Sequence, residues 1–193
     1  EKMFWTFDPL RSRNAHLNVT RLGIVVREYV ENMYGDSDSP LHRGIGTDRF
    51  IALWLLDSAR VRRAVEAIEG VSGAGIEATS AGGTDPSDPW PPEVAGAPSA
   101  LGWEMAERLP RPGTPELGLS APALRVAIPS DLDPVMQADP GLAVSWREAT
   151  RAAFRHYLEN GYEVRFFQRG DPTSTYGLAR RTDPDVPSPA DAP

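Results

Sequence analysis

The chain has 193 residues, of which 40% are hydrophobic, and a formal net charge of −7. This charge is unfavourable for binding nucleic acid or an anionic membrane surface, because both are themselves negative. The lack of cysteine excludes a disulfide framework, a thiolate nucleophile and a cysteine-ligated zinc site. No apolar run approaches the ~20 residues that span a bilayer and no signal-peptide pattern is found, so the sequence predicts a cytoplasmic protein.

Hydrophobic residues and turn-forming residues are unevenly distributed along the chain. The hydrophobic residues concentrate in three blocks, roughly 3–35, 45–69 and 123–180, whereas most of the proline and glycine lies between and after them. We therefore expect a domain over 1–69, a Pro/Gly/Ala-rich linker over 70–122, a C-terminal α/β subdomain over 123–180 and a disordered tail over 181–193.

The first block predicts a strand, a short helix and a second strand. Residues 3–7 are rich in aromatics and suit a strand, which ends where proline removes a backbone donor. Ser12 is a suitable N-cap for a helix that runs to about residue 21. Gly23 closes that helix as a left-handed cap, and residues 24–30 form the next strand.

The first predicted strand has no earlier partner in the sequence. A strand needs partners for its backbone N–H and C=O groups. We therefore expect this chain to be the later part of a larger α/β domain, lacking about a hundred residues. A strand left exposed in this way also invites pairing with another chain, for example in a homodimer.

The rest of the first domain predicts a central strand and a helix. Residues 49–56 form a continuous apolar run, as expected for a strand covered on both faces. Asp57 and Ser58 can cap a helix over about 59–69. Its basic side, which carries Arg60, Arg62 and Arg63, suits a solvated face.

Regular periodicity is lost from about residue 70 to 121, apart from a short helix that could form near 102–109. It resumes in the last block. There we expect a strand over 124–128, a short helix from 131 to about 137, a long helix over 142–160, and a β-hairpin of residues 162–168 and 173–179.

The order of strand, Asn-Ala-bearing helix, Leu-Gly and strand resembles the closing segment of the GNAT (GCN5-related) acyltransferase fold. The chain is similar, more narrowly, to a bacterial family of predicted GNAT acetyltransferases. The motifs that carry this resemblance are Trp5-Thr6-Phe7-Asp8-Pro9-Leu10, Ser12-x-Asn14-Ala15, Thr47-Asp48-Arg49-Phe50 and Trp54-x-Leu56-Asp57-Ser58, followed later by Trp146-Arg147, Phe154 and Gly161-Tyr162. It implies a mixed α/β fold with a partial GNAT-like sheet, flanking helices and a small C-terminal α/β subdomain.

The resemblance implies an acyl-CoA-dependent N-acyltransferase that uses acetyl-CoA as co-substrate. In that fold the cofactor lies between two splayed strands, and the first strand here is one of them. Trp5 and Thr6 would line the thioester, and Ser12, Asn14 and Asn18 would contact the pantetheine. The loop that binds the pyrophosphate precedes this region in the family, so we expect it to be absent from this chain.

The acceptor implied by the resemblance is an amine on a small molecule or a peptide. Arg49 could orient it through a carboxylate, with a structural ion pair at Asp48 and Arg49 as the alternative. Val19 takes the position at which the family often has a proton-donating tyrosine, which leaves the catalytic acid unassigned. This departure keeps open a second hypothesis, a non-catalytic module that binds a partner or regulates.

Other polar and aromatic residues have plainer interpretations. His16 could act as a general base, although a surface or packing role is the simpler alternative. The three histidines lack metal-ligand spacing, so no metal is predicted. Trp146 and Tyr162 suit core anchors, with the lining of an acceptor pocket as the alternative.

Overall fold

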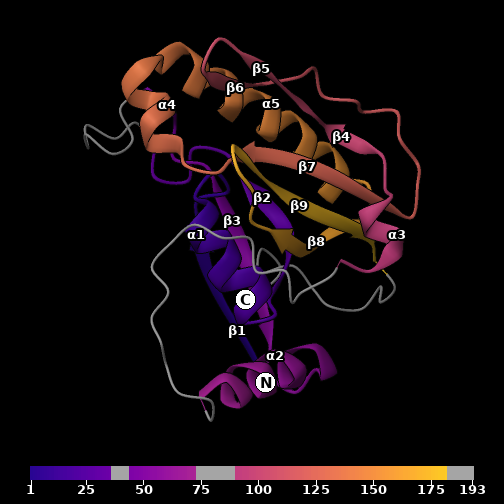
Figure 1. Cartoon of the computed structure of the whole chain (residues 1–193). Helices are drawn as coiled ribbons and strands as arrows, with labels where there is room; N and C mark the ends of the chain where they lie inside the picture. Colours follow the sequence, from indigo (N-terminus) through magenta and orange to yellow (C-terminus); the bar gives the residue numbers. More distant parts are fainter. Residues whose placement is uncertain (36–43, 73–89, 182–193) are drawn as a thin grey trace.

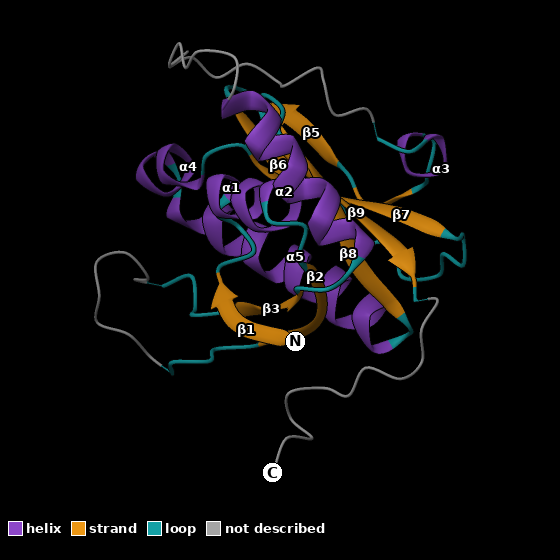
Figure 2. Ribbon diagram, turned by 90° about the horizontal axis from the view of Figure 1, so that it is seen from below, coloured by secondary structure: helices purple, strands orange, loops and turns teal. Residues whose placement is uncertain are grey.

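A computed structural model describes residues 1–35, 44–72 and 90–181. Within them the fold is mixed α+β, as predicted, with a seven-stranded mixed sheet in the order β1-β3-β2-β8-β9-β7-β4 and a separate pair β5-β6 (Figures 1 and 2). The strands are β1 (Lys2–Phe7), β2 (Val25–Val30), β3 (Arg49–Leu55), β4 (Ser99–Leu101), β5 (Trp103–Ala106), β6 (Leu109–Pro112), β7 (Ala123–Pro129), β8 (Tyr162–Gln168) and β9 (Thr173–Arg180). The helices are α1 (Ser12–Ala15), the π-helical segment η1 (His16–Arg21), α2 (Ala59–Ser72), α3 (Pro92–Ala95), α4 (Leu132–Ala138) and α5 (Pro140–Glu159).

The first strand finds its partner inside the chain, which corrects the expectation of a partner outside it. β1 pairs antiparallel with β3 along its whole length, from Lys2 opposite Leu55 to Phe7 opposite Phe50. β3 is central because β2 pairs with its other side. The sequence could not reveal this pairing, because it joins segments more than forty residues apart. β1 is nevertheless an edge strand, and among the described residues no strand pairs with its outer side.

The helix between β1 and β2 forms where predicted, but it begins differently. The N-cap residue is Arg11, and its side chain makes no capping hydrogen bond. The prediction of Ser12 as N-cap is therefore wrong. Gly23 has the predicted left-handed backbone, with φ +69°. A Cβ atom at Gly23 would lie 3.2 Å from the Cβ of Ala64 in α2, so this glycine also permits close packing of α2.

The C-terminal elements agree with the predictions. Asp131 caps α4 by accepting a hydrogen bond from the backbone of Asp133, and the Asp139 side chain caps α5 in the same way. Gly161, with φ +83°, follows α5 and leads into the hairpin of β8 and β9. This hairpin extends the sheet that contains the N-terminal strands.

The segment from 90 to 122 differs from the expected linker and contains α3, β4, β5 and β6. The helix considered near 102–109 is instead the hairpin of β5 and β6. Proline lacks a donor but keeps its carbonyl, and the carbonyl of Pro110 accepts a hydrogen bond from Trp146 of α5. Long-range contacts of this kind order a segment whose composition predicts none. Residues 73–89 of the expected linker and 182–193 of the expected tail lie outside the described residues.

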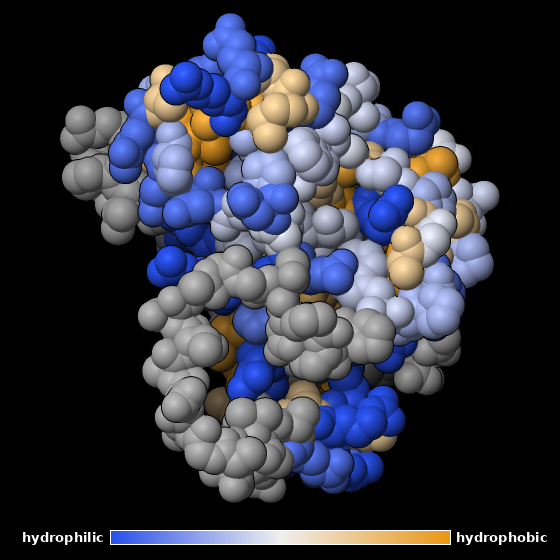
Figure 3. Space-filling view, in the orientation of Figure 1, coloured by the Kyte–Doolittle hydropathy of each residue, from blue (hydrophilic) through white to orange (hydrophobic). Residues whose placement is uncertain are grey.

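One hydrophobic core runs through both ends of the sheet. Phe50 of β3 packs edge-on against Phe154 of α5 and Tyr176 of β9, with ring centroids 4.7 and 5.5 Å apart. The face seen in Figure 3 is mostly hydrophilic, with hydrophobic residues in small separate areas. Within the described residues, no helix is both long and apolar enough to cross a membrane.

Candidate functional site

Three of the residues predicted to contact a cofactor lie together beside β1. The indole N–H of Trp5 donates to Oδ1 of Asn18 at 2.8 Å, and Nδ2 of Asn18 donates to the carbonyl of Asn14 at 2.7 Å. Asn18 is buried, whereas Asn14 is exposed. The ring of Trp5 also packs edge-on against Trp54 of β3. We call Trp5, Asn14 and Asn18 the β1 cluster.

The other two predicted cofactor residues lie apart from this cluster. Ser12 is buried, and its hydroxyl lies 2.9 Å from the hydroxyl of Ser174 in β9. Thr6 shares a hydrogen bond of 3.1 Å with the hydroxyl of Tyr34. Successive strand residues point to opposite faces, so Thr6 and Trp5 project away from each other. The predicted set is therefore divided among three places.

Arg49, the predicted acceptor-binding residue, makes local contacts at the start of β3. Its Nη1 donates to the carbonyl of Asp48 at 3.0 Å and lies 3.8 Å from the carboxylate of Asp8. Its guanidinium also lies over the ring of Tyr34, 5.0 Å from the centroid. Arg49 therefore belongs to an ion pair, and its carboxylate partner is Asp8. The side chain of Asp48 pairs with α5 instead.

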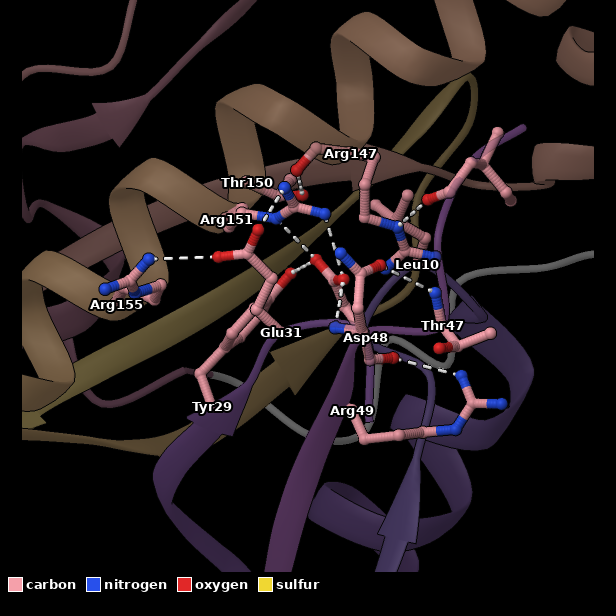
Figure 4. A network of polar contacts seen from close by, with 12 residues as sticks. Leu10, Tyr29, Glu31, Thr47, Asp48, Arg49, Arg147, Thr150, Arg151 and Arg155 are labelled. Atoms are coloured by element: carbon pink, nitrogen blue, oxygen red, sulfur yellow. Dashed lines mark hydrogen bonds and ion pairs between the residues drawn. The ribbon is translucent and has the colours of Figure 1, made fainter. Parts of the chain in front are cut away.

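Asp48 is fully buried at the centre of a polar network (Figure 4). Nε and Nη2 of Arg151 donate to its two carboxylate oxygens at 2.8 and 3.0 Å. The hydroxyl of Tyr29 donates at 2.5 Å, and the backbone N–H of Asn32 donates at 3.0 Å. Burial by itself favours the neutral acid, but these donors outweigh it and hold the pKa of Asp48 below its ordinary value.

The neighbouring groups respond to the same charges. Burial, assisted by the charge of Asp48 and its hydrogen bond, raises the pKa of Tyr29, although Arg147 acts in the opposite direction. The hydrogen bond to Asp48 raises the pKa of Arg151. Tyr29 therefore stays neutral and Arg151 stays charged at physiological pH.

Arg147 of α5 is a second buried charge. Its side chain is 2% exposed. Nη2 donates to Asp8 at 2.9 Å, and Nε donates to the carbonyl of Ile45 at 3.0 Å. Burial by itself lowers the pKa of Arg147. The charge of Asp8 and its hydrogen bond raise that pKa by more, so the net shift is upward. Nη1 is buried and has no hydrogen-bond partner in the described part of the chain.

A cavity of about 400 Å³ adjoins these arginines. Its described lining comes from α5 and from the loops on either side of residues 36–43. The residues are Asn32, Gly35, Gly44, Ile45, Gly46, Thr47, Val144, Arg147, Glu148 and Arg151. Gly46 has φ +74°, and a Cβ atom there would approach Oδ1 of Asn32 to 2.6 Å, so only glycine lets the loop close against Asn32.

Trp146 and Tyr162 are fully buried, as their interpretation as core anchors predicts. The Tyr162 hydroxyl donates to the carbonyl of Ala121 at 2.7 Å. His16 is partly buried in η1 and His156 is partly buried in α5. Among residues 1–35, 44–72 and 90–181, no group of three or more His, Asp and Glu could hold a metal ion.

The roles of four residues were not predicted from the sequence, namely Asp8, Tyr29, Arg147 and Arg151. The only usable signal is the spacing of the two arginines, which lie four residues apart on α5 and so share a helix face. The sequence does not identify which acids they meet, because Asp8 lies 139 residues from Arg147. Comparisons with protein-family models, with curated proteins and with solved structures gave no match. The resemblance to the GNAT fold therefore stays a prediction.

Proposed function

We propose that the chain contributes one wall of an acyl-CoA site and takes part in transferring an acyl group to an amine. The observation that carries the proposal is the outer side of β1, which no described strand covers, next to the β1 cluster. A free strand edge offers alternating N–H and C=O groups, and the two amides of a pantetheine arm can pair with such groups. Asn14 adds an exposed side-chain amide at the same place.

The β1 cluster would position the ligand and would not supply acid catalysis. The Trp5–Asn18 hydrogen bond fixes the indole beside the strand, where it can pack against the thioester. Neither asparagine can donate a proton as an acid, and Val19 is fully buried. The rate would then come mainly from holding an amine against the thioester in the right orientation. The pyrophosphate would be held by polypeptide other than the described residues.

The test uses S-acetylpantetheine, which lacks the phosphates of acetyl-CoA and therefore probes the proposed wall alone. Addition to the isotope-labelled chain should shift the indole N–H resonance of Trp5 and the side-chain amide resonances of Asn14 and Asn18. The resonance of Trp103, an exposed indole on β5, serves as the internal control and should stay unchanged. Unmoved Trp5 and Asn14 resonances at saturating ligand would reject the proposal.

The same proposal predicts how acetyl-CoA itself behaves. Without contacts to its pyrophosphate, acetyl-CoA should bind this chain more weakly than micromolar when measured by calorimetry. Micromolar binding would mean that this chain itself contains a pyrophosphate site. That result would contradict the proposal that other polypeptide holds the pyrophosphate. The Trp5→Phe variant keeps the ring and loses the N–H, so it should weaken S-acetylpantetheine binding; Trp103→Phe is the matched control.

Two observations favour a non-catalytic module as the second candidate. Val19 is part of the core, and Met3 and Phe4 of β1 are 50% and 42% exposed, which suits a partner surface. The discriminating measurement is thiol release from acetyl-CoA by the full polypeptide in which the chain occurs, with amino acids, polyamines and peptides as acceptors. Release above the uncatalysed rate favours the transferase. Shifts of the β1 cluster resonances without thiol release favour the non-catalytic module.

A further inference from the structure

We propose that two copies of this chain pair antiparallel through the outer side of β1, about a two-fold axis that passes beside Phe4. β1 is the last strand at one end of the sheet (Figures 1 and 2), and no described strand pairs with its outer side. Natural edge strands are usually protected from such pairing by proline, a bulge or charged side chains. The register of β1 has no bulge, and residues 3–7 contain neither proline nor charge.

The hydrogen bonds between β1 and β3 determine which backbone groups of β1 point outward. The carbonyl of Glu1 accepts from the backbone N–H of Leu56, so the backbone groups of Glu1 face β3. Successive residues of a strand direct their backbone groups to alternate sides. The N–H and C=O groups of Lys2, Phe4 and Thr6 therefore point away from β3. No described residue hydrogen-bonds to these groups.

A two-fold antiparallel pair that uses all three outward residues has a single register. Phe4 then faces Phe4 of the second copy, and Lys2 of each copy faces Thr6 of the other. Each facing pair exchanges two backbone hydrogen bonds. This register also places each lysine opposite a neutral threonine, and like charges directly opposite each other would be unfavourable. The pairing therefore satisfies the outward groups without opposing charges of the same sign.

The same register buries the exposed apolar side chains of β1. Met3 and Phe4 are 50% and 42% exposed, and they project to opposite faces of the sheet because they are adjacent in a strand. On one face, Phe4 packs against Phe4 of the second copy. On the other face, Met3 lies opposite Trp5 of the second copy, which gives a favourable contact between sulfur and an aromatic ring. Both faces of the joined strands thus contribute to the pairing.

The interface is small, and it overlaps the site of the proposed function. One strand from each copy buries less than the ~1,200 Å² of a standard interface, so the dimer should be weak and should form as the concentration rises. A pantetheine arm would use the same outward N–H and C=O groups, so the pairing would regulate that site by competition. This last consequence rests on the proposed function, whereas the pairing itself does not.

The first test uses the lack of cysteine in the chain, because a single cysteine can be introduced. In the proposed register the two Phe4 Cα atoms lie about 5.5 Å apart, within the range of about 4.4–6.8 Å that a disulfide spans. Phe4→Cys should therefore form a covalent dimer under mild oxidation. Met3→Cys, at a similarly exposed position, is the matched control. Its two copies lie diagonally, beyond the ~7 Å limit for a disulfide, so it should cross-link at least about tenfold more slowly. Equal rates would overturn the register.

The second test measures the mass of the chain by analytical ultracentrifugation over a range of concentrations. The natural chain should change reversibly from monomer to dimer. Phe4→Lys places two like charges opposite each other and should weaken the dimer at least about fivefold. Met105→Lys, the same kind of change at a 53% exposed residue of β5, is the matched control and should leave the dimer unchanged. A natural chain that stays monomeric, or equal dimerisation of the two variants, would overturn the proposal. No CoA-derived ligand is present in either test, so their results are independent of the S-acetylpantetheine experiment.

Discussion

The two ends of the sheet are each held together by backbone hydrogen bonds, whereas their junction depends on side chains. Every residue of β7 is paired with β9, and β1 is paired along its whole length with β3. Between β2 and β8, where the ends meet, only Val26 and Val164 are paired. The backbone hydrogen bonds between strands therefore stabilise each end of the sheet, and other contacts must join the two ends.

Arginine side chains provide most of the polar bonds across this junction. Nε of Arg27 in β2 meets the buried carboxylate of Glu163 in β8 at 2.6 Å. Arg60 of α2, placed by the sequence analysis on a solvated face, donates to the carbonyl of Arg165 and to those of Val19 and Gly23. A guanidinium suits this use because one group can reach several acceptors. Further bonds across the junction are Arg11–Asp133, Arg147–Asp8, Arg151–Asp48, Arg151–Glu31, Arg155–Glu31 and Arg181 to the carbonyl of Arg27.

The largest effect is expected from breaking the most buried of these pairs. Arg147→Met leaves the buried Asp8 with only the more distant Arg49 as a cationic partner, and should lower the free energy of unfolding by about 3–5 kcal/mol. Urea denaturation measures this loss. Arg155→Met, on the exposed side of the same helix, is the control and should cost under about 1 kcal/mol.

A double variant separates the loss of the Arg147 pair from a general loss of packing. Asp8→Asn combined with Arg147→Met removes both charges, and should recover a large part of the lost stability because no buried charge is left unpaired. If the double variant is no more stable than Arg147→Met alone, the pair does not act as argued here.

The second effect concerns Asp48 and depends on pH. Asp48→Asn should cost about 2 kcal/mol at neutral pH, because the hydrogen bonds from Arg151 and Tyr29 lose the negative charge on their acceptor. The folded protein holds the pKa of Asp48 below the ordinary 3.8, so ionised Asp48 stabilises the fold above about pH 4. This contribution is lost as the pH falls through the folded-state pKa.

The difference in stability between the natural chain and Asp48→Asn should accordingly shrink below about pH 4. Chemical denaturation at a series of pH values measures it. Glu159→Gln is a suitable control, because Glu159 is exposed and lies outside the network. A difference that stays constant through this acid range contradicts the assigned role of Asp48.

Local patterns in the sequence predicted the elements on both sides of the junction, but not the junction. The apolar run at 49–56, the helices predicted from 131 and over 142–160, and the left-handed Gly23 all depend on residues close together in the sequence, and these predictions were confirmed. The strands β4, β5 and β6 were missed because proline, glycine and alanine are poor strand formers, and α5 and β7 order them from a distance.

The same limit applies to the candidate site. Trp5, Asn14 and Asn18 lie within fourteen residues of one another in the sequence and are neighbours in the structure, whereas Thr6 and Ser12 of the same predicted set lie apart from them. Arg49 was singled out, but its partner Asp8 lies 41 residues earlier, directly after β1. Arg147, which lines the cavity, and Asp48, at the centre of the polar network, are about a hundred residues apart, so no spacing rule could bring them together.

The smallest effect sharpens the comparison at the junction itself. Glu163→Gln keeps a hydrogen-bond acceptor for Arg27 but removes the charge, so the loss should be only about 1 kcal/mol. Because Glu163 is buried, added salt should reduce this loss very little. Glu159→Gln removes an exposed charge of the same kind and should change the stability by less than about 0.5 kcal/mol. Urea denaturation of both variants at low and high salt measures the two losses. Equal losses would mean that the arginine bonds at the junction are no stronger than surface ion pairs, and that the aromatic core alone joins the two ends.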